Sequence, residues 1–233
     1  MTRKVAVVTA ASKGMGAACA TELAQRGYDM VLMSRSDAVL ELANKLQGMG
    51  LIGDVMNPAD LERVVSGAYQ RYGRIDAIVN NTGHPPKGDL LEISDQQWHD
   101  GLDLLLLNVV RTARHVVPIM EKNGGGSIVN ISSFGARDTS PAFPLSSALR
   151  ASLSAFTKLF ADRYADRRVR MNTVLPGFVD SYPIDNQTKA QIPMQRSGST
   201  KEIAKTVAFL LSDDAGYITG QSICVDGGLG RSF

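Results

Sequence analysis

Short runs of β-branched and aliphatic residues alternate along this chain with longer segments whose apolar positions recur at a helical spacing. Such alternation is typical of strand–helix–strand units, in which helices connect successive parallel strands. The pattern predicts an α/β fold with a doubly wound, seven-stranded parallel sheet in a single domain over residues 1–233. The strands are expected near Val5–Thr9, Met30–Met33, Gly50–Asp54, Ile75–Val79, Ser127–Ser132, Arg170–Leu175 and Ser222–Val225, with helices in the intervals.

Local signals mark several helix ends. Ser94 followed by Gln97 resembles a capped helix start, and Pro58 is suited to a first helical turn. The three glycines of residues 124–126 are expected to end the helix that runs to about Lys122. Residues 177–199, rich in Pro, Ser, Asn and Gln, form the one long irregular candidate. This segment is either a plain surface connection or a mobile substrate lid, and its place after a strand favours the lid.

Composition excludes some functions. The formal net charge is only +2, from 25 basic and 23 acidic residues, so no concentrated field for nucleic acid or an anionic membrane is expected. The two cysteines, Cys19 and Cys224, do not suggest a disulfide framework. The first residues lead directly into a strand without a signal peptide, and no apolar run reaches membrane-spanning length. These features predict a soluble cytoplasmic protein. No metal site is expected.

A glycine-rich turn follows the first expected strand. The stretch from Thr9 to Gly16 reads Thr-Ala-Ala-Ser-Lys-Gly-Met-Gly and leads into a helix. Glycines in such a turn let a pyrophosphate approach the backbone and the positive end of the helix. This motif predicts a Rossmann-like nucleotide site that includes Thr9, Ala11, Ser12, Lys13, Gly14, Met15 and Gly16.

Further motifs, in order along the chain, resemble the short-chain dehydrogenase/reductase family and its 3-oxoacyl-ACP reductases. The turn resembles the family's Thr-Gly-x-x-x-Gly-x-Gly, with Ala10 in place of the first glycine. Asn80-Asn81-Thr82-Gly83 resembles Asn-Asn-Ala-Gly, and residues 126–133 resemble the strand that ends at the catalytic serine. The resemblance implies cofactor contacts from Asp54, Val55, Asn81, Gly83, Pro176 and Gly177, and places Asn108 where the family has an asparagine that supports a proton-relay water.

The residues after the second expected strand bear on cofactor choice. An acidic side chain there accepts hydrogen bonds from the NAD ribose, whereas a basic one accommodates the extra phosphate of NADP. This chain has Ser34-Arg35-Ser36, and Lys13 adds another cation. Because the planar guanidinium makes bidentate bonds to phosphate, Arg35 favours NADP(H), with NAD(H) as the alternative.

The expected catalytic motif is changed. In the family, a Tyr-x-x-x-Lys motif opens a long helix beyond the catalytic serine. Here Ser146 stands 13 residues after Ser133, and Arg150 takes the place of the lysine. Ser132 is the alternative serine if the strand ends one residue earlier. A serine hydroxyl is a far weaker acid than tyrosine, and a guanidinium does not readily release a proton. Ser133, Ser146, Arg150 and Asn108 are therefore the predicted catalytic residues of a site without an obvious proton donor.

Three functions are compatible with this sequence. The first is an NADP(H)-dependent oxidoreductase acting on a carbonyl or conjugated enoyl substrate, with Arg150 positioning the cofactor. The second is a catalytically weak or inactive nucleotide-binding homologue that serves as a sensor or partner subunit. The third is a non-redox isomerase or cyclase that reuses the cleft. The first is favoured.

Substrate and assembly are less constrained. Five residues are expected around the site and suggest a partly apolar small-molecule substrate: Phe134, Phe143, Leu145, Phe178 and Tyr182. His84 could reach the cleft, although a plain loop role is the favoured interpretation. Trp98, Leu102 and residues 104–107 resemble the interface helix of a family whose members are commonly homotetramers, so a homo-oligomer (tetramer or dimer) is expected.

Overall fold

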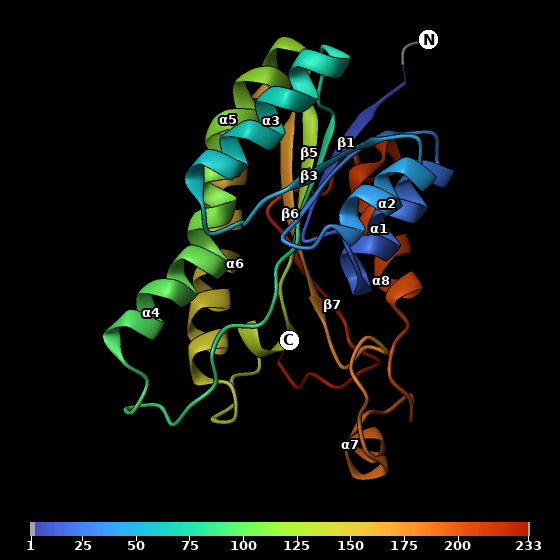
Figure 1. Ribbon diagram of the computed structural model, residues 1–233. Coiled ribbons are helices and arrows are strands. Elements are labelled where there is room, and N and C mark those ends of the chain that lie inside the picture. The colour runs from blue at the N-terminus through green and yellow to red at the C-terminus, as the bar shows by residue number, and fades with distance from the viewer. Residues whose placement is uncertain (1–2, 233) are drawn as a thin grey trace.

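A seven-stranded, all-parallel sheet forms the centre of the molecule (Figure 1). The computed structural model describes residues 3–232. The strand order is β3-β2-β1-β4-β5-β6-β7, so the chain winds outward from β1 first in one direction and then in the other. The strands are β1 (Val5–Thr9), β2 (Asp29–Ser34), β3 (Met49–Ile52), β4 (Ala77–Asn80), β5 (Gly126–Ile131), β6 (Val169–Pro176) and β7 (Ser222–Val225).

Helices cover both faces of this sheet (Figure 1). One face carries α1 (Gly14–Gln25), α2 (Ala38–Lys45) and α8 (Thr200–Leu211); the other carries α3 (Pro58–Tyr72), α5 (Asn108–Lys122) and α6 (Pro144–Tyr164). Two apolar clusters, one on each face, hold the layers together. Because β1 and β4 are buried along their whole length, their continuous aliphatic runs are explained by helices on both sides.

The fold confirms the predicted α/β class and all seven strands, with small shifts at their ends. The expected strand to Asp54 stops at Ile52, which pairs with Ser34, the last residue of β2. The strand expected to reach Ser132 stops at Ile131. The helix ends also follow their local signals: Ser94 and Gln97 form a capping box, Pro58 lies in the first turn of α3, and α5 ends at Lys122.

One prediction of irregular structure was wrong in part. Residues 177–199 contain a short helix, α7 (Asn186–Gln191), whose first turn is capped by the Asp185 carboxylate. An isolated bridge between Val179 and Gly198 closes the segment into a compact unit. The segment lies beyond β6, at the same end of the sheet as the candidate site (Figure 1).

Candidate functional site

The site is built around the point where the strand order reverses, at the carboxyl ends of β1 and β4. Thr9 ends β1 and donates from Oγ1 to the Asn81 carbonyl at 2.7 Å. In return, the Asn81 backbone N–H donates to Thr9 Oγ1 at 2.9 Å. Such a reversal leaves a crevice outside the strand ends, which is where open α/β sheets bind ligands. Thr9 and Asn81 therefore hold the two walls of this crevice together.

The glycine-rich turn is tightly constrained. A Cβ on Gly16 would lie 2.4 Å from the Ala10 carbonyl oxygen and 2.7 Å from Asn81 Nδ2, so no side chain fits there. Gly14 adopts a φ of 58°, and Ala10, in the place of the family glycine, adopts a left-handed φ of 46°. The Ala10 carbonyl accepts a hydrogen bond from Asn81 Nδ2 at 3.1 Å. The turn thus keeps a glycine-like geometry despite the methyl group, with some backbone strain at Ala10.

This turn suits the phosphates of a dinucleotide. Helix α1 begins after Lys13 and has no side-chain cap, whereas Asn57, Ser94 and Ser199 cap the starts of α3, α4 (Asp95–Leu102) and α8. The first N–H groups of α1 are therefore left for another acceptor, at the positive end of the helix. The cradle that excludes a Cβ at Gly16 and the uncapped helix start together fit a bound pyrophosphate.

Residues expected to contact the adenosine half of a dinucleotide lie beside this turn. Arg35 follows β2 with 76% of its side chain exposed, and its Nη1 lies 3.8 Å from the Asp54 carboxylate. Ser34 Oγ donates to Ser12 Oγ at 2.9 Å, which ties the end of β2 to the turn. Val55 is buried. The structure thus brings the proposed phosphate-binding arginine and the proposed adenine-contacting aspartate to the same edge of the crevice.

Arg150 is buried in the first half of α6. Only 5% of the residue is exposed, and burial lowers the pKa of its guanidinium to about 10. Its Nη1 donates to the Ile131 carbonyl at 3.1 Å and its Nε to Ser146 Oγ at 3.2 Å. No carboxylate pairs with Arg150 among residues 3–232. Ser146 and Arg150 therefore act as one hydrogen-bonded unit that presents positive charge at the end of β5.

The two serines after β5 have different surroundings. Ser133 is half-buried, and its Oγ accepts a hydrogen bond from the Gly135 backbone at 3.3 Å, which caps the short 3₁₀ helix Phe134–Ala136. Ser132 is 5% exposed, and its buried Oγ has no hydrogen-bond partner within the described residues. A buried unpaired hydroxyl is costly and rare. Because β5 ends at Ile131, one residue earlier than predicted, the condition that makes Ser132 a candidate is met, and both serines stay candidates.

Beneath the site, four buried polar side chains connect three strands with α6. Asn80 Nδ2 donates to Asn130 Oδ1 at 2.9 Å, and Asn130 Nδ2 donates to the hydroxyls of Thr157 and Thr173 at 3.3 and 3.4 Å. The two threonine hydroxyls lie 2.8 Å apart. This network fixes α6, and with it Ser146 and Arg150, relative to β4, β5 and β6.

Asn108 begins α5 directly after a π-helical turn, Asp103–Leu107. Its side-chain amide donates to the Leu104 carbonyl within the same helix, and the residue is 5% exposed. Single π-turns inside α-helices are frequent at functional sites. The structure thus places Asn108 at a distorted point of the helix, with its Nδ2 already bonded.

The segment after β6 reaches across the crevice. Pro176 ends the strand, and a Cβ on Gly177 would lie 2.8 Å from Asp226 Cα, so the close approach of two backbones requires glycine. Farther along, Ser181 Cβ would lie 3.6 Å from a Cβ on Gly14. This contact brings the segment against the glycine-rich turn, on the far side of the crevice from β6.

The residues expected to surround the site do not all lie near it. Phe134 and Phe178 contact each other with ring centroids 5.8 Å apart, and Lys87 Nζ lies 5.4 Å from the Phe143 ring centroid. The expectation for Leu145 was wrong: it is fully buried in a small cluster with Ile93 and Leu105. Leu145 faces α4 because it lies on the opposite side of α6 from the crevice.

His84, for which the sequence favoured a plain loop role over a place at the cleft, lies against the segment that follows β6. Its ring meets the Tyr182 ring edge to face, with centroids 5.0 Å apart and an interplanar angle of 89°. Burial lowers the pKa of His84, and the positive charges of Arg150 and Lys87 lower it further. His84 therefore shares the electrostatic environment of the Arg150 site. No periodicity or motif signals this, because the contact joins two loops that are 98 residues apart in the chain.

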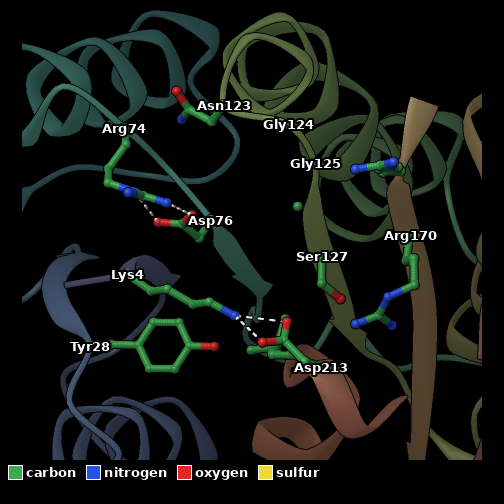
Figure 2. Close-up of a pocket in the computed structure, with 13 residues that line it drawn as sticks. Lys4, Tyr28, Arg74, Asp76, Asn123, Gly124, Gly125, Ser127, Arg170 and Asp213 are labelled. Carbon is green, nitrogen blue, oxygen red and sulfur yellow. Dashed lines mark hydrogen bonds and ion pairs between the residues drawn. The ribbon is translucent and has the colours of Figure 1, made fainter. Parts of the chain in front are cut away.

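A cavity of about 310 Å³ lies at the other end of the sheet, where the strands begin (Figure 2). Lys4 pairs with Asp213 at 2.8 Å, and Arg74 pairs with Asp76 at 2.6 Å. Arg170 donates to the carbonyls of Ile218 and Ser212 at 3.0 Å each. Lys4 and Arg74 are thus paired with carboxylates and Arg170 is bonded to backbone carbonyls, so these polar groups are engaged within the protein, and the cavity lies away from the predicted chemistry.

An apolar groove of about 510 Å³ runs between α5 and α6. Leu159, with 67% of its surface exposed, lines it together with Val117 and Phe156. The predicted interface residues behave differently: Trp98 and Leu104 pack against the Leu145 cluster inside the molecule. Both side chains are only partly buried by this packing against α6, so their role in an interface stays a prediction.

Within residues 3–232 no group of three or more metal-ligating side chains occurs, and none of the helices there is long and apolar enough to span a bilayer. Cys19 and Cys224 are both free. Burial raises the pKa of Cys19 to about 12, so this thiol is protonated and unreactive.

Comparison with known proteins agrees with this geometry. A nucleotide-type crevice at a reversed strand order, with a glycine turn and an uncapped helix, defines the class of Rossmann-like α/β proteins. The family model described as "Enoyl-(Acyl carrier protein) reductase" matches residues 9–230. The chain belongs to the short-chain dehydrogenase/reductase family, and it is an oxidoreductase of that type.

Individual relatives cover nearly the whole chain. The 3-oxoacyl-[acyl-carrier-protein] reductase FabG of Escherichia coli (strain K12) is 34% identical over 236 residues, covering 97% of this chain and 97% of the relative. Dehydrogenase/reductase SDR family member 4 of Homo sapiens is 34% identical over 244 residues, with 98% and 88% covered. Among solved structures, acetoin dehydrogenase YohF from Salmonella typhimurium aligns with a TM-score of 0.89 at 32% identity, covering 97% of each chain.

Proposed function

We propose that this protein is an NADP(H)-dependent oxidoreductase that reduces a carbonyl or conjugated enoyl group at a site without the family's tyrosine and lysine. The observation that carries the cofactor assignment is the position of Arg35. It extends from the end of β2 with most of its side chain exposed, and its Nη1 lies 3.8 Å from the Asp54 carboxylate. The preceding residue, Ser34, is bonded to Ser12 of the glycine-rich turn. A ribose 2′-phosphate is the group that a guanidinium at this position recognises.

The roles of the other residues follow from where they lie. Lys13, Gly14 and Met15 open α1 and would bind the pyrophosphate through backbone N–H groups, while Gly16 keeps the turn close. Ala11, Val55, Asn81, Gly83, Pro176 and Gly177 would complete the walls around the bound dinucleotide, as in the family. When bound, the nicotinamide supplies or accepts a hydride.

Arg150 stabilises the site electrostatically. Its guanidinium is held by the Ile131 carbonyl and by Ser146, so its position is set before any ligand binds. A cation at a buried position strongly favours negative charge nearby, such as that developing on a carbonyl oxygen. We assign the hydroxyls of Ser133 and Ser146 to hold this oxygen, with Asn108 supporting a water behind them.

A partly apolar substrate suits the surroundings of this site. Phe134 and Phe178 form one aromatic wall, and Phe143 lies near Lys87 on the approach. We propose that residues 177–199 act as the lid, because Ser181 already contacts the region of Gly14. The substrate would then enter between the lid and the loop that follows β4.

Two measurements test this function. Fluorescence titration with NADPH and NADH measures cofactor affinity, and NADPH oxidation is followed with a panel of ketones and enoyl thioesters. We expect tighter binding of NADPH and turnover of at least one substrate class. Binding without oxidation of any substrate would exclude the reductase and favour a nucleotide-binding protein.

That second function, a catalytically weak or inactive NADP(H)-binding sensor or partner subunit, has one observation in its favour. Ser146, in the place of the tyrosine, uses its hydroxyl to accept a hydrogen bond from Arg150. A hydroxyl held in this way stabilises the arginine and is no acid at neutral pH. The substrate panel separates the two functions directly.

We also propose that the protein assembles as a homodimer or homotetramer through the groove between α5 and α6. Leu159, Val117 and Phe156 give this groove an apolar floor, and exposed apolar patches of this kind mark interfaces. Arg114, Glu121 and Arg167 also line the groove, and charged side chains of this kind suit the polar rim of an interface. A second copy of the chain supplies the matching surface.

We also propose that the protein is located in the cytoplasm. Cys19 and Cys224 are both unpaired, which suits a reducing compartment.

A further inference from the structure

The contact between His84 and Tyr182 closes over the end of one particular strand. His84 follows β4 and Tyr182 follows β6, and the sheet order places β5 between these two strands. The rings meet edge to face with centroids 5.0 Å apart. The two loops therefore meet above the carboxyl end of β5. Ser132, Ser133 and the Ile131 carbonyl that holds Arg150 all lie at this end.

Two cations and one aromatic ring act on this exposed imidazole. Arg150 belongs to α6, Lys87 belongs to the same loop as His84, and the uncharged Tyr182 ring comes from the segment after β6. Burial lowers the pKa of His84 below its ordinary value of 6.5, and the charges of Arg150 and then Lys87 act in the same direction. This electrostatic effect agrees with the placement that the ring contact and the strand order give to His84, above the end of β5.

We propose that His84 is the acid–base group of this site and replaces the proton-transfer role of the missing tyrosine, with Tyr182 positioning its ring. This inference rests on the proposed oxidoreductase function. Histidine is the side chain best suited to proton transfer near neutral pH. The neighbouring groups do not offer an equivalent: Arg150 keeps its proton at neutral pH, and serine hydroxyls do not ionise.

The step balances as follows for a carbonyl substrate. The carbonyl carbon receives a hydride, with its two electrons, from the reduced nicotinamide. The electron pair of the C=O π bond moves to oxygen, which takes the proton of the His84 imidazolium and becomes a hydroxyl. The products are the alcohol, the oxidised nicotinamide and neutral imidazole, which regains a proton from water. In the reverse direction, neutral His84 removes the hydroxyl proton.

The direction of the pKa shift sets the pH dependence. His84 is mostly neutral at pH 7, so it is a ready base and needs a lower pH to act as an acid. Reduction is therefore expected to slow as pH rises through the His84 pKa, below 6.5 in the free protein. Alcohol oxidation is expected to quicken through the same pH range.

Chemical rescue tests the assignment on the whole protein. We expect His84→Ala to lower kcat by roughly 10²-fold or more, the typical contribution of a general acid or base. Added imidazole should restore part of this loss, and the pH limb below 6.5 should disappear. His99→Ala, an exposed histidine on α4, is the matched control and should retain full activity. A His84→Ala variant with unchanged kcat and pH profile overturns the proposal.

Tyr182 provides the second arm of this experiment. If Tyr182 positions the ring by contact, Tyr182→Phe keeps the aromatic edge and should retain most activity, whereas Tyr182→Ala should lose part of it. The opposite result, in which Tyr182→Phe abolishes turnover and His84→Ala does not, would make the tyrosine hydroxyl the proton donor and overturn the role of His84.

A measurement without turnover tests the electrostatic link. The protein has three histidines, so the His84 imidazole signal can be assigned by NMR from its absence in His84→Ala. We expect a pKa below 6.5 in the wild-type protein and a higher value in both Arg150→Met and Lys87→Met. If the pKa of His84 is not lowered and does not change in either variant, His84 lies outside the Arg150 site.

These outcomes separate the inference from the function on which it rests. If the wild-type protein binds NADPH but oxidises it with no substrate, the oxidoreductase function fails and the acid–base role falls with it. If the wild-type protein turns over while His84→Ala is unaffected, the function stands and only the inference fails.

Discussion

The buried guanidinium of Arg150 donates a hydrogen bond to the backbone carbonyl of Ile131, the last residue of β5, at 3.1 Å. The bond joins α6 to the strand that leads to Ser132 and Ser133. Arg150 supplies a cation where the family resemblance expects a lysine. Ser146, which is bonded to Arg150, lacks the acidity of a tyrosine. Proton transfer at this site therefore needs a donor other than Ser146 and Arg150.

The first prediction concerns restoration of the family's pair. The double variant Ser146→Tyr, Arg150→Lys should create or raise carbonyl reduction by about 10²-fold, because it returns a phenol beside an ammonium. NADPH oxidation with the responsive ketones measures the gain. Ser152→Tyr, an exposed position on α6, serves as the control and should add nothing. A folded, NADPH-binding double variant that stays inert would contradict the alignment of Ser146 and Arg150 with the family's motif.

The second prediction concerns cofactor selectivity. Arg35→Asp should weaken NADPH binding by roughly 10-fold or more and affect NADH much less, since a hydrogen bond to a charged group contributes about 1.5–3 kcal/mol. Fluorescence titration gives both dissociation constants. Arg71→Asp, an exposed arginine in the last turn of α3, makes the same charge change away from the crevice. Equal losses for both cofactors would exclude a phosphate role for Arg35.

The third prediction concerns strain in the glycine-rich turn. Ala10 has a φ of 46°, which glycine adopts without penalty. Ala10→Gly should raise the free energy of unfolding by roughly 0.5–1 kcal/mol, because relief of strain exceeds the added entropy of the unfolded chain. Denaturant unfolding measures the change. Ala17→Gly, inside α1, should instead lower stability by about 1 kcal/mol. Destabilisation by Ala10→Gly would show that the methyl group packs favourably.

The fourth prediction concerns assembly. Leu159→Glu places a charge in the groove between α5 and α6 and should shift the protein toward monomers, because an unpaired charge in an apolar interface is costly. Sedimentation velocity or light scattering reports the oligomeric state. Leu91→Glu changes a leucine that is more exposed, at 91%, but lies outside the groove. It should leave the assembly unchanged. A Leu159→Glu protein with wild-type mass would move the interface elsewhere.

The fifth prediction concerns acid stability next to the lid. The Arg196 guanidinium, with the Ser199 backbone and hydroxyl groups, lowers the pKa of Glu202 to about 2 from 4.5. The carboxylate therefore stabilises the fold above pH 4.5, and this contribution is lost as pH falls toward 2. Glu202→Gln should cost about 1 kcal/mol or less at pH 7, because the pair is half-exposed and screened by solvent.

The difference between Glu202→Gln and the wild-type protein should shrink as the pH is lowered, in denaturant titrations at several pH values. Glu62→Gln, on the exposed side of α3, is the control and should show no pH-dependent difference. A constant difference at all pH values would assign the effect to packing.

Much of the fold was predictable because its causes are local. The aliphatic run of β1 is buried on both sides, and the capping box of Ser94 and Gln97 starts α4 as its spacing indicates. The end of β3 was less predictable, because it depends on where β2 stops offering partners. Helix α7 was missed because it is short, polar and defined by one Asp185 cap.

The site was predictable only where it follows motifs. The glycine-rich turn, Asn81, Ser133 and Arg150 lie at strand ends or on a helix, and the strand order brings them together. Leu145 was misplaced because a one-residue difference on a helix turns a side chain by about 100° to another face. His84 was undervalued because loop–loop contacts depend on tertiary packing that no local pattern encodes.

The buried network of Asn80, Asn130, Thr157 and Thr173 has a consequence for how the active-site helix can evolve. Thr157 is the member of this network that lies on α6, and sliding the helix by one residue would carry its hydroxyl away from Asn130 and Thr173. A buried polar group left unbonded costs about 1–3 kcal/mol. Positions 146 and 150 are therefore locked in register, whatever residues occupy them. Exchanging the side chains at positions 146 and 150 therefore changes the groups presented at the end of β5 while the backbone that carries them stays in place.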